Sequence, residues 1–289
     1  MDLTGRRESS NVDDRRGMST KTKAGIGGGV GVIVLALLTW IMGGNPLSVI
    51  QQSGGLSSLQ TEQTQSEHQF TEQEQQLAKF SKQVLASTED IWTEVFKSMG
   101  RKYVPPKMVL YTNSVQTSCG QGDASVGPFY CSADQCLYID LSFFMQMKSQ
   151  LGADGDFAYA YVIAHEVGHH VEYLLGTLEQ AHSQMQRVNK TQANKISVRL
   201  ELLADFYAGI WGHYENKMFH SLDDGDIQEA VNCAQVIGDN YLQEKARGYS
   251  QPESFTHGTS AQRMKWLKLG LTTGDMSKGN TFELSDKDL

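Results

Sequence analysis

"VIAHEVGHHVEYLLG", residues 162–176, decides the fold, because it places His165, Glu166 and His169 in the order H-E-x-x-H within an apolar stretch. On a helix, positions i and i+4 lie on one face about one turn apart, so both imidazoles can reach one metal ion. Glu166 is displaced around the helix, where it can contact a metal-bound water. The string predicts a buried helix with two zinc ligands and a general base. The alternative is an ordinary helix that happens to carry these residues.

A catalytic zinc site needs a third protein ligand, and "VRLELLADFYAGIWG", residues 198–212, offers one. Glu201 and Asp205 are four residues apart on one helical face, in a stretch where two unpartnered carboxylates would be costly to bury. We expect Glu201 to complete the zinc site and Asp205 to accept the distal N–H of His165, which fixes the tautomer of that imidazole. An amphipathic helix whose acids face water is the alternative.

The remaining patterning predicts an α+β fold, a mainly helical domain with a small β-sheet. Apolar residues recur with the helical period from residue 72 to 99, and Gly100 is a natural stop. Alternating branched and aromatic residues predict strands. The expected strands span 107–112 and 136–144, and further helices span 156–175, 192–216, 226–245 and 259–269.

The N-terminal region predicts one transmembrane helix. Residues 24–42 carry no charge and are apolar enough to span a bilayer, which takes about 20 residues. Six Lys and Arg residues precede this run, and none follows it until Lys79. The asymmetry favours an uncleaved single-pass anchor with a cytoplasmic N-terminus and an extracytoplasmic domain, periplasmic or at the cell surface. A cleaved signal peptide is the alternative.

These patterns divide the chain into five parts. They are a basic cytoplasmic N-terminus (1–23), the anchor (24–42), a flexible Gln/Ser/Gly tether (43–71), the zinc-binding domain (72–272) and a polar tail (273–289). The formal net charge is −8 and no basic cluster carries interleaved aromatic residues, so nucleic acid is not an expected partner.

The four cysteines all follow the predicted anchor. An even count outside the cytoplasm predicts up to two disulfides, and four cysteines allow three connectivities. The alternative is four free, buried cysteines. The residues concerned are Cys119, Cys131, Cys136 and Cys233.

Several stretches resemble the bacterial neutral zinc metallopeptidase family, a glutamate-zincin type with H-E-x-x-H. They cover most of residues 75–272 and are, in chain order, "CGQGDASVGPFYC", "YIDLSFF", "YVIAHEVGHHVE", "ELLADFYAGIW", "AQVIGDNYLQ" and "FTHGTSAQRMKWLKLG". The resemblance implies a zincin-like fold and a peptide or protein substrate. It also implies Zn²⁺ as cofactor, bound by His165, His169 and Glu201. Glu166 would then be the general base, and Asp205 would contact a zinc ligand without binding the ion itself.

The resemblance also singles out His257 in "THGTS" to stabilise the oxyanion, with Arg263 as a companion. By spacing alone, His257 would be a surface histidine. The segment 127–130 is expected to form a cleft wall or, alternatively, a disulfide-pinned structural loop. At Asn240 the sequence lacks a second acid that the family pattern leads us to expect, so "IGDN" is given no role beyond structure.

The sequence therefore predicts a membrane-anchored, extracytoplasmic zinc-dependent endopeptidase. Glu166 takes a proton from a zinc-bound water and later delivers it to the leaving amine. One alternative is a zinc amidase that acts on cell-wall peptides or other amides. Another is a non-catalytic envelope protein with a structural zinc, although such a site normally closes its fourth position with a protein ligand and none is evident.

Overall fold

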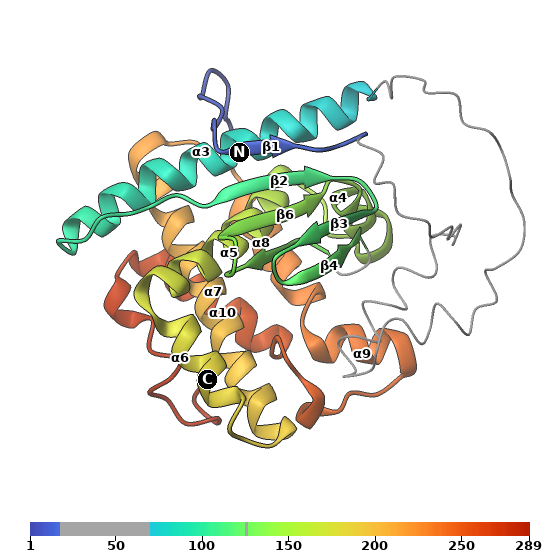
Figure 1. Cartoon of the computed structure of the whole chain (residues 1–289), viewed down its shortest axis with the longest axis vertical. Coiled ribbons are helices and arrows are strands. Elements are labelled where there is room, and N and C mark those ends of the chain that lie inside the picture. Colours follow the sequence, from blue (N-terminus) through green and yellow to red (C-terminus); the bar gives the residue numbers. More distant parts are fainter. Residues whose placement is uncertain (18–69, 125–126) are drawn as a thin grey trace, which may run out of the picture.

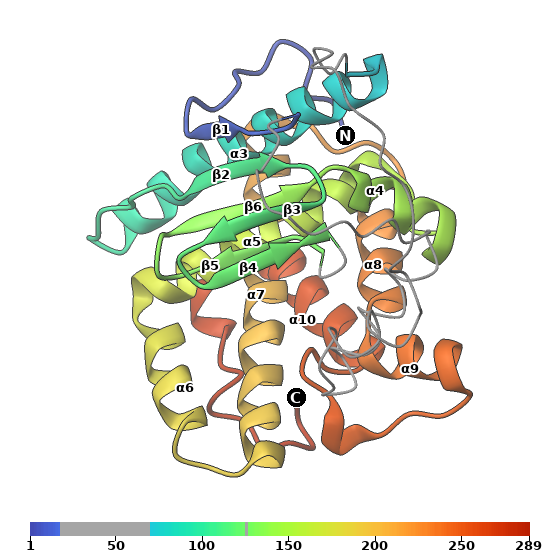
Figure 2. The same ribbon diagram turned by 45° about the vertical axis from the view of Figure 1, so that its right-hand side comes forward.

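The two stretches that carry the site motifs are neighbouring helices in the computed structural model, which describes residues 1–17, 70–124 and 127–289. Helix α5 (Asp156–Leu175) packs along α7 (Lys190–Phe219), and α10 (Ser260–Thr273) also packs on α7. Small residues permit this close packing, since a Cβ on Gly209 of α7 would collide with the backbone of Leu267 in α10. Figure 2 shows α7 and α10 extending below the sheet.

A four-stranded mixed sheet has the order β1–β2–β6–β5, and β3 and β4 form a separate antiparallel hairpin. β1, β2 and β6 run parallel, whereas β5 is antiparallel to β6. All five residues of β6 are buried, which explains its continuous apolar pattern. The strands are β1 (Val12–Asp14), β2 (Lys107–Tyr111), β3 (Ser114–Thr117), β4 (Gly120–Asp123), β5 (Phe129–Cys131) and β6 (Cys136–Asp140).

The strand predicted over 136–144 ends early, at Asp140. One carboxylate oxygen of Asp140 accepts the backbone N–H of Ser142, and the other accepts that of Asn113. The first contact lets the chain turn into α4 (Ser142–Gln146), which continues as a short π-helix, η2 (Met147–Leu151).

Residues 1–17 belong to the same packed unit as the site helices. Strand β1 pairs with β2, and both lie beside the long helix α3 (Glu72–Ser98) in Figure 1. Two arginines of this segment are paired with buried acids: Arg6 is 3.0 Å from Glu215, and Arg7 is 2.9 Å from Glu89. The N-terminal ammonium group donates a hydrogen bond to the carboxylate of Asp156 at the start of α5.

This packing corrects the membrane layout expected from the sequence. A single span over 24–42 would place 1–23 and the zinc-binding domain on opposite sides of a bilayer, whereas residues 12–14 and 108–110 pair in one sheet. The predicted span itself lies outside the described residues, as does the tether up to residue 69. Within the described ranges, no helix is both long and apolar enough to cross a membrane. The α+β class is confirmed, but the predicted transmembrane helix and single-pass localisation are wrong.

The remaining helices differ from expectation at one break and in one additional helix, α6, that the sequence did not predict. The helix predicted over 226–245 is two helices, α8 (Asp226–Val236) and α9 (Asp239–Arg247). A Cβ on Gly238 between them would lie 2.6 Å from the Cα of Ser260, so the chain turns where the start of α10 comes close. Helix α6 (Thr177–Met185) connects α5 to α7, and two 3₁₀ turns, η3 (Pro252–Ser254) and η4 (Met276–Lys278), flank α10.

The polar stretch 273–289 packs on α7. Arg199 donates a hydrogen bond to the carbonyl of Leu284 at 2.9 Å and pairs with Asp286 at 2.6 Å. The hydroxyl of Thr281, fully buried, donates to the carbonyl of Arg199. These contacts hold the stretch against the face of α7 on which Arg199 lies.

Candidate metal centre and active-site cleft

Helix α5 places His165 and His169 side by side. Their ring centroids are 4.9 Å apart, as the i and i+4 spacing requires. His165 and Glu166 are buried, although the side chains are polar. The helix ends at Gly176, whose φ of +85° gives the left-handed cap that glycine favours.

Helix α7 brings Glu201 to both histidines. One carboxylate oxygen of Glu201 is 3.2 Å from Nε2 of His165, and the other is 3.6 Å from Nε2 of His169. Helices α5 and α7 approach so closely at Gly168 that a Cβ there would lie 2.8 Å from the carbonyl oxygen of Ala204. The three residues predicted to bind zinc are therefore brought together.

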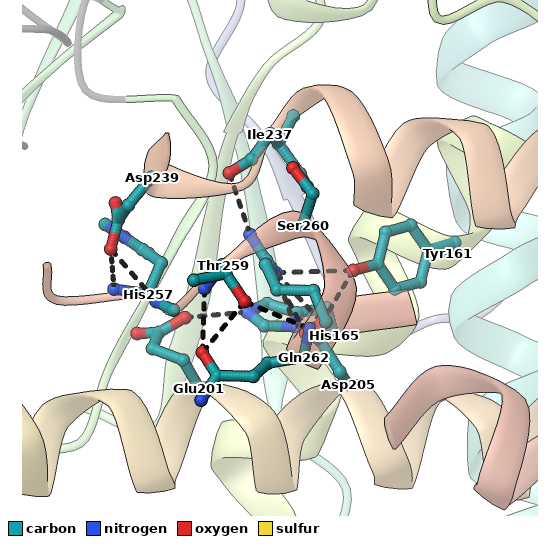
Figure 3. A network of polar contacts seen from close by, with 12 residues as sticks. Tyr161, His165, Glu201, Asp205, Ile237, Asp239, His257, Thr259, Ser260 and Gln262 are labelled. Atoms are coloured by element: carbon teal, nitrogen blue, oxygen red, sulfur yellow. Dashed lines mark hydrogen bonds and ion pairs between the residues drawn. The ribbon is translucent and has the colours of Figure 1, made fainter. Parts of the chain in front are cut away.

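Asp205 lies behind His165, as the sequence predicted, and is fully buried. Its Oδ1 accepts from Nδ1 of His165 at 2.8 Å and from the hydroxyl of Tyr161 at 2.6 Å. Arg263 of α10 donates to both oxygens, from Nε at 2.8 Å and from Nη2 at 2.9 Å. Figure 3 shows the side chains of Tyr161, His165 and Asp205 close together in this network. Arg263, expected beside His257, thus holds Asp205 instead.

Glu172 lies in the corresponding place beside Nδ1 of His169, and the sequence reasoning missed it. Its Oε2 lies 2.9 Å from Nδ1 of His169, and the side chain is fully buried. Its position three residues after His169, on the same helical face, is the signal that could have found it.

His257 lies in the loop before α10 and lines the same cleft as the three predicted ligands. Asp239, at the start of α9, holds this loop: its Oδ2 accepts the backbone N–H groups of Thr256, His257 and Gly258 at 2.7 to 2.9 Å. Its Oδ1 is 3.3 Å from Nδ1 of His257 (Figure 3). The "IGDN" segment therefore positions His257, through Asp239, and the Asn240 side chain accepts the N–H of Ser260.

The charges of the site shift its pKa values strongly. Burial alone lowers the pKa of His165, but Asp205 and Glu201 outweigh it and raise the pKa to about 9. Burial likewise opposes a rise at His169, whose pKa is nevertheless well above its ordinary value beside Glu201 and Glu172. Burial raises the pKa of Asp205, yet Arg263 and His165 bring it down to about 2. These side chains form one electrostatically coupled group.

Two other carboxyls of the group respond mainly to burial. Removal from water raises the pKa of Glu166 above its ordinary value and that of Glu172 to about 7. The pKa of Glu201 is instead well below its ordinary value, because His257 and His169 outweigh the effect of burial.

The donor set and its geometry fit a zinc ion. Ligand atoms of a tetrahedral site with bonds of about 2.0–2.1 Å lie roughly 3.3 Å apart. The two nitrogen-to-oxygen separations at Glu201, 3.2 and 3.6 Å, are close to this value.

The net charge of the surrounding side chains also fits a bound cation. Four carboxylates, those of Glu166, Glu172, Glu201 and Asp205, surround the two histidines, and one guanidinium, that of Arg263, pairs with them. Histidines that bind a metal are neutral, and with ionised carboxylates this group would then carry three negative charges, which a divalent cation would reduce to one. Without the ion, protons on His165 and His169, whose pKa values are raised, offset part of this negative charge. The residues present therefore fit a bound dication.

A cleft of about 650 Å³ opens onto the predicted ligands and Glu166. The expected segment 127–130 lines it, together with the β3–β4 hairpin, η2 and α6. The hydroxyl of Tyr130 lies 2.8 Å from Nδ1 of His170, whose Nε2 donates to the carbonyl of Val104 at 2.7 Å. Buried His170 thus ties this wall to α5, next to His169.

One disulfide is present, where the sequence predicted up to two. Cys119 and Cys131 are bonded, which links the turn of the β3–β4 hairpin to β5. The wall segment is therefore both part of the cleft and pinned by a disulfide. Cys136 and Cys233 are free and buried, as the alternative of free cysteines has it for these two. Burial raises the pKa of both free thiols.

Comparisons with known proteins agree with this geometry. Residues 1–282 match the model of the family described as "Putative neutral zinc metallopeptidase". The chain is 44% identical over 283 residues to "Uncharacterized protein YpfJ" of Escherichia coli (strain K12), covering 96% of this chain and 97% of that one. It is 40% identical over 202 residues to "Uncharacterized protein Rv2575" of Mycobacterium tuberculosis (strain ATCC 25618 / H37Rv), covering 66% and 67%. No solved structure matches. The chain belongs to this zinc metallopeptidase family.

Proposed function

We propose that this member of the neutral zinc metallopeptidase family is a zinc-dependent endopeptidase that cuts within polypeptide chains. The observation that carries the proposal is the three-residue cluster of His165, His169 and Glu201 with Glu166 buried beside it. Within the described ranges the cluster has three ligand residues, and a catalytic zinc site keeps its fourth position for water or substrate. A structural zinc site would use a fourth protein ligand there.

In this proposal His165, His169 and Glu201 bind the ion. Asp205 accepts a hydrogen bond from the protonated Nδ1 of His165, so that the unprotonated Nε2 faces the ion. When bound, zinc lowers the pKa of a water molecule to about 7 and polarises the scissile carbonyl. Glu166 accepts the proton of the attacking water and passes it to the leaving amine. His257, oriented by Asp239, donates a hydrogen bond to the oxygen on which negative charge develops.

The cleft supports a peptide substrate. Apart from the cluster itself, Glu166 and Arg263, the described residues that line the cleft include no Lys, Arg, Asp or Glu. Its walls carry apolar side chains, among them Phe129, Phe143 and Leu200. Such walls suit the uncharged side chains of a polypeptide on both sides of the bond that is cut.

The test compares the full-length wild type with Glu166→Gln at equal zinc content, and uses the full chain because residues 1–17 are part of the fold. Each protein is incubated with a mixture of native and denatured bacterial proteins, and new N-termini are counted by mass spectrometry. We expect cleavage by the wild type and a loss of several orders of magnitude in the variant. Glu179→Gln removes the same charge from an exposed site on α6 and is expected to leave cleavage unchanged.

The reasoning fails if the two proteins release the same new N-termini at equal rates. If neither protein produced new N-termini, the endopeptidase would also be rejected. Release of amide products from cell-wall peptides by the wild type alone would then identify the site as an amidase.

A further inference from the structure

Glu172 lies on the side of His169 away from Glu201. The imidazole lies between two carboxylates: Nδ1 is 2.9 Å from Oε2 of Glu172, and Nε2 is 3.6 Å from Oε1 of Glu201. Glu172 is fully buried and is not among the residues that line the cleft. It therefore contacts a predicted metal ligand and no substrate.

We propose that Glu172 is a positioning residue for the metal centre, because it accepts the Nδ1 proton of His169 and thereby presents Nε2 to the metal. The inference rests on the metal cluster of the proposed function. A carboxylate behind a ligating imidazole fixes its tautomer and its ring orientation, and makes the nitrogen on the metal a stronger donor. Each histidine of the motif then has its own buried carboxylate, Asp205 for His165 and Glu172 for His169.

The surroundings of the two carboxylates differ in a way that separates positioning from packing. Asp205 accepts hydrogen bonds from Tyr161 and Arg263 as well as from His165, so it also ties three helices together. Oε2 of Glu172 bonds to His169, and its Oε1 is buried without a hydrogen-bond partner among the described residues. A buried carboxylate with a single partner stabilises a fold poorly. Its location is better explained by its effect on His169.

A positive charge on the far side of His169 would offset part of this burial cost. Glu172 and a cation bound at Nε2 then stabilise each other through the same imidazole ring. Removing the carboxylate should therefore weaken metal binding.

The experiment measures Zn²⁺ affinity of the full-length chain by competition with a chromogenic chelator. The proteins are wild type, Glu172→Gln, which keeps the side-chain volume, Glu172→Ala, and the exposed control Glu179→Gln. The visible absorption of Co²⁺ bound in place of Zn²⁺ reports ligand geometry, and urea unfolding of the metal-free proteins reports the fold. None of these readouts requires activity.

We expect the Kd for Zn²⁺ to rise about 10-fold to 100-fold in Glu172→Ala, less in Glu172→Gln, and not at all in Glu179→Gln. The Co²⁺ spectrum should shift in both Glu172 variants. An affinity and a spectrum equal to those of wild type in Glu172→Ala, which has no acceptor for the Nδ1 proton, would overturn the inference and leave the proposed function intact. If the wild type itself bound no Zn²⁺, both proposals would fall.

Discussion

Replacing Gly168 by alanine should weaken the metal centre, although alanine is the better helix former. Gly168 lies between Glu166 and His169 on α5, against the backbone of α7. A Cβ there would be 2.8 Å from the carbonyl oxygen and 3.0 Å from the Cα of Ala204. These are backbone atoms that cannot rotate away, so the two helices must separate by several tenths of an ångström.

Two opposing magnitudes decide the outcome. Alanine gains about 1 kcal/mol over glycine inside a helix. Overpacking a close contact costs about 1–3 kcal/mol. The free energy of unfolding of the metal-free protein should therefore fall by up to about 2 kcal/mol.

Metal binding should suffer more than stability. A metal site tolerates ligand displacements of only about 0.2 Å. Ala204 lies between Glu201 and Asp205 on α7, so moving α7 away from α5 moves Glu201 away from both histidines. We expect Zn²⁺ affinity to fall about 10-fold to 100-fold, the range seen when the supports of ligands are altered.

Urea unfolding of the metal-free Gly168→Ala variant and chelator competition for Zn²⁺ measure the two effects separately. Gly212→Ala on α7 is a matched control, because its Cβ would meet only the side-chain tips of Leu271 and Phe157, at 2.7 and 3.2 Å, which can shift. A Gly168→Ala protein that is about 1 kcal/mol more stable and binds Zn²⁺ as tightly as wild type would refute the reasoning.

Three other changes have expected outcomes. Arg263→Met leaves a buried carboxylate without its guanidinium, so urea unfolding should show a loss of about 3–5 kcal/mol, and a loss under 1 kcal/mol would contradict the pairing. Replacing both Cys119 and Cys131 by serine opens a loop of sequence separation 12 and should cost about 3 kcal/mol, whereas equal unfolding midpoints would show that the bridge adds no stability. Met185→Lys places a cation in the cleft, so the cleavage sites should shift toward acidic residues of the substrate. Met218→Lys, at an exposed position, is the control. An unchanged profile of cleavage sites would place Met185 outside the substrate path.

The two site helices could be predicted because their evidence is local. The i and i+4 spacing of His165 and His169, and of Glu201 and Asp205, puts each pair on one helical face whatever surrounds it. The cost of burying two acids in an apolar helix then requires partners for them. The distances from Glu201 to both histidines and from Asp205 to His165 agree with this argument.

The contacts that the sequence did not predict join residues far apart in the chain. Arg263 is 58 residues from Asp205, and Asp239 is 18 residues from His257, so no helical period relates either pair. The disulfide likewise depends on the pairing of β5 with β6 and the position of the hairpin turn. Glu172 is different, because its spacing from His169 is local and could have been read as a partner.

The membrane prediction failed because counting Lys and Arg residues before the apolar run ignores the acids with which those residues pair in the fold. Arginines before an apolar run signal topology when they face the cytoplasm. Here Arg6 pairs with Glu215 of α7, and Arg7 pairs with Glu89 of α3. Both acids belong to helices that begin after residue 70, so two of the six charges counted before the span are structural contacts within the fold that carries the site. Basic residues before an apolar run are therefore weaker evidence for topology where, as for Arg6 and Arg7, acids of the later chain pair with them.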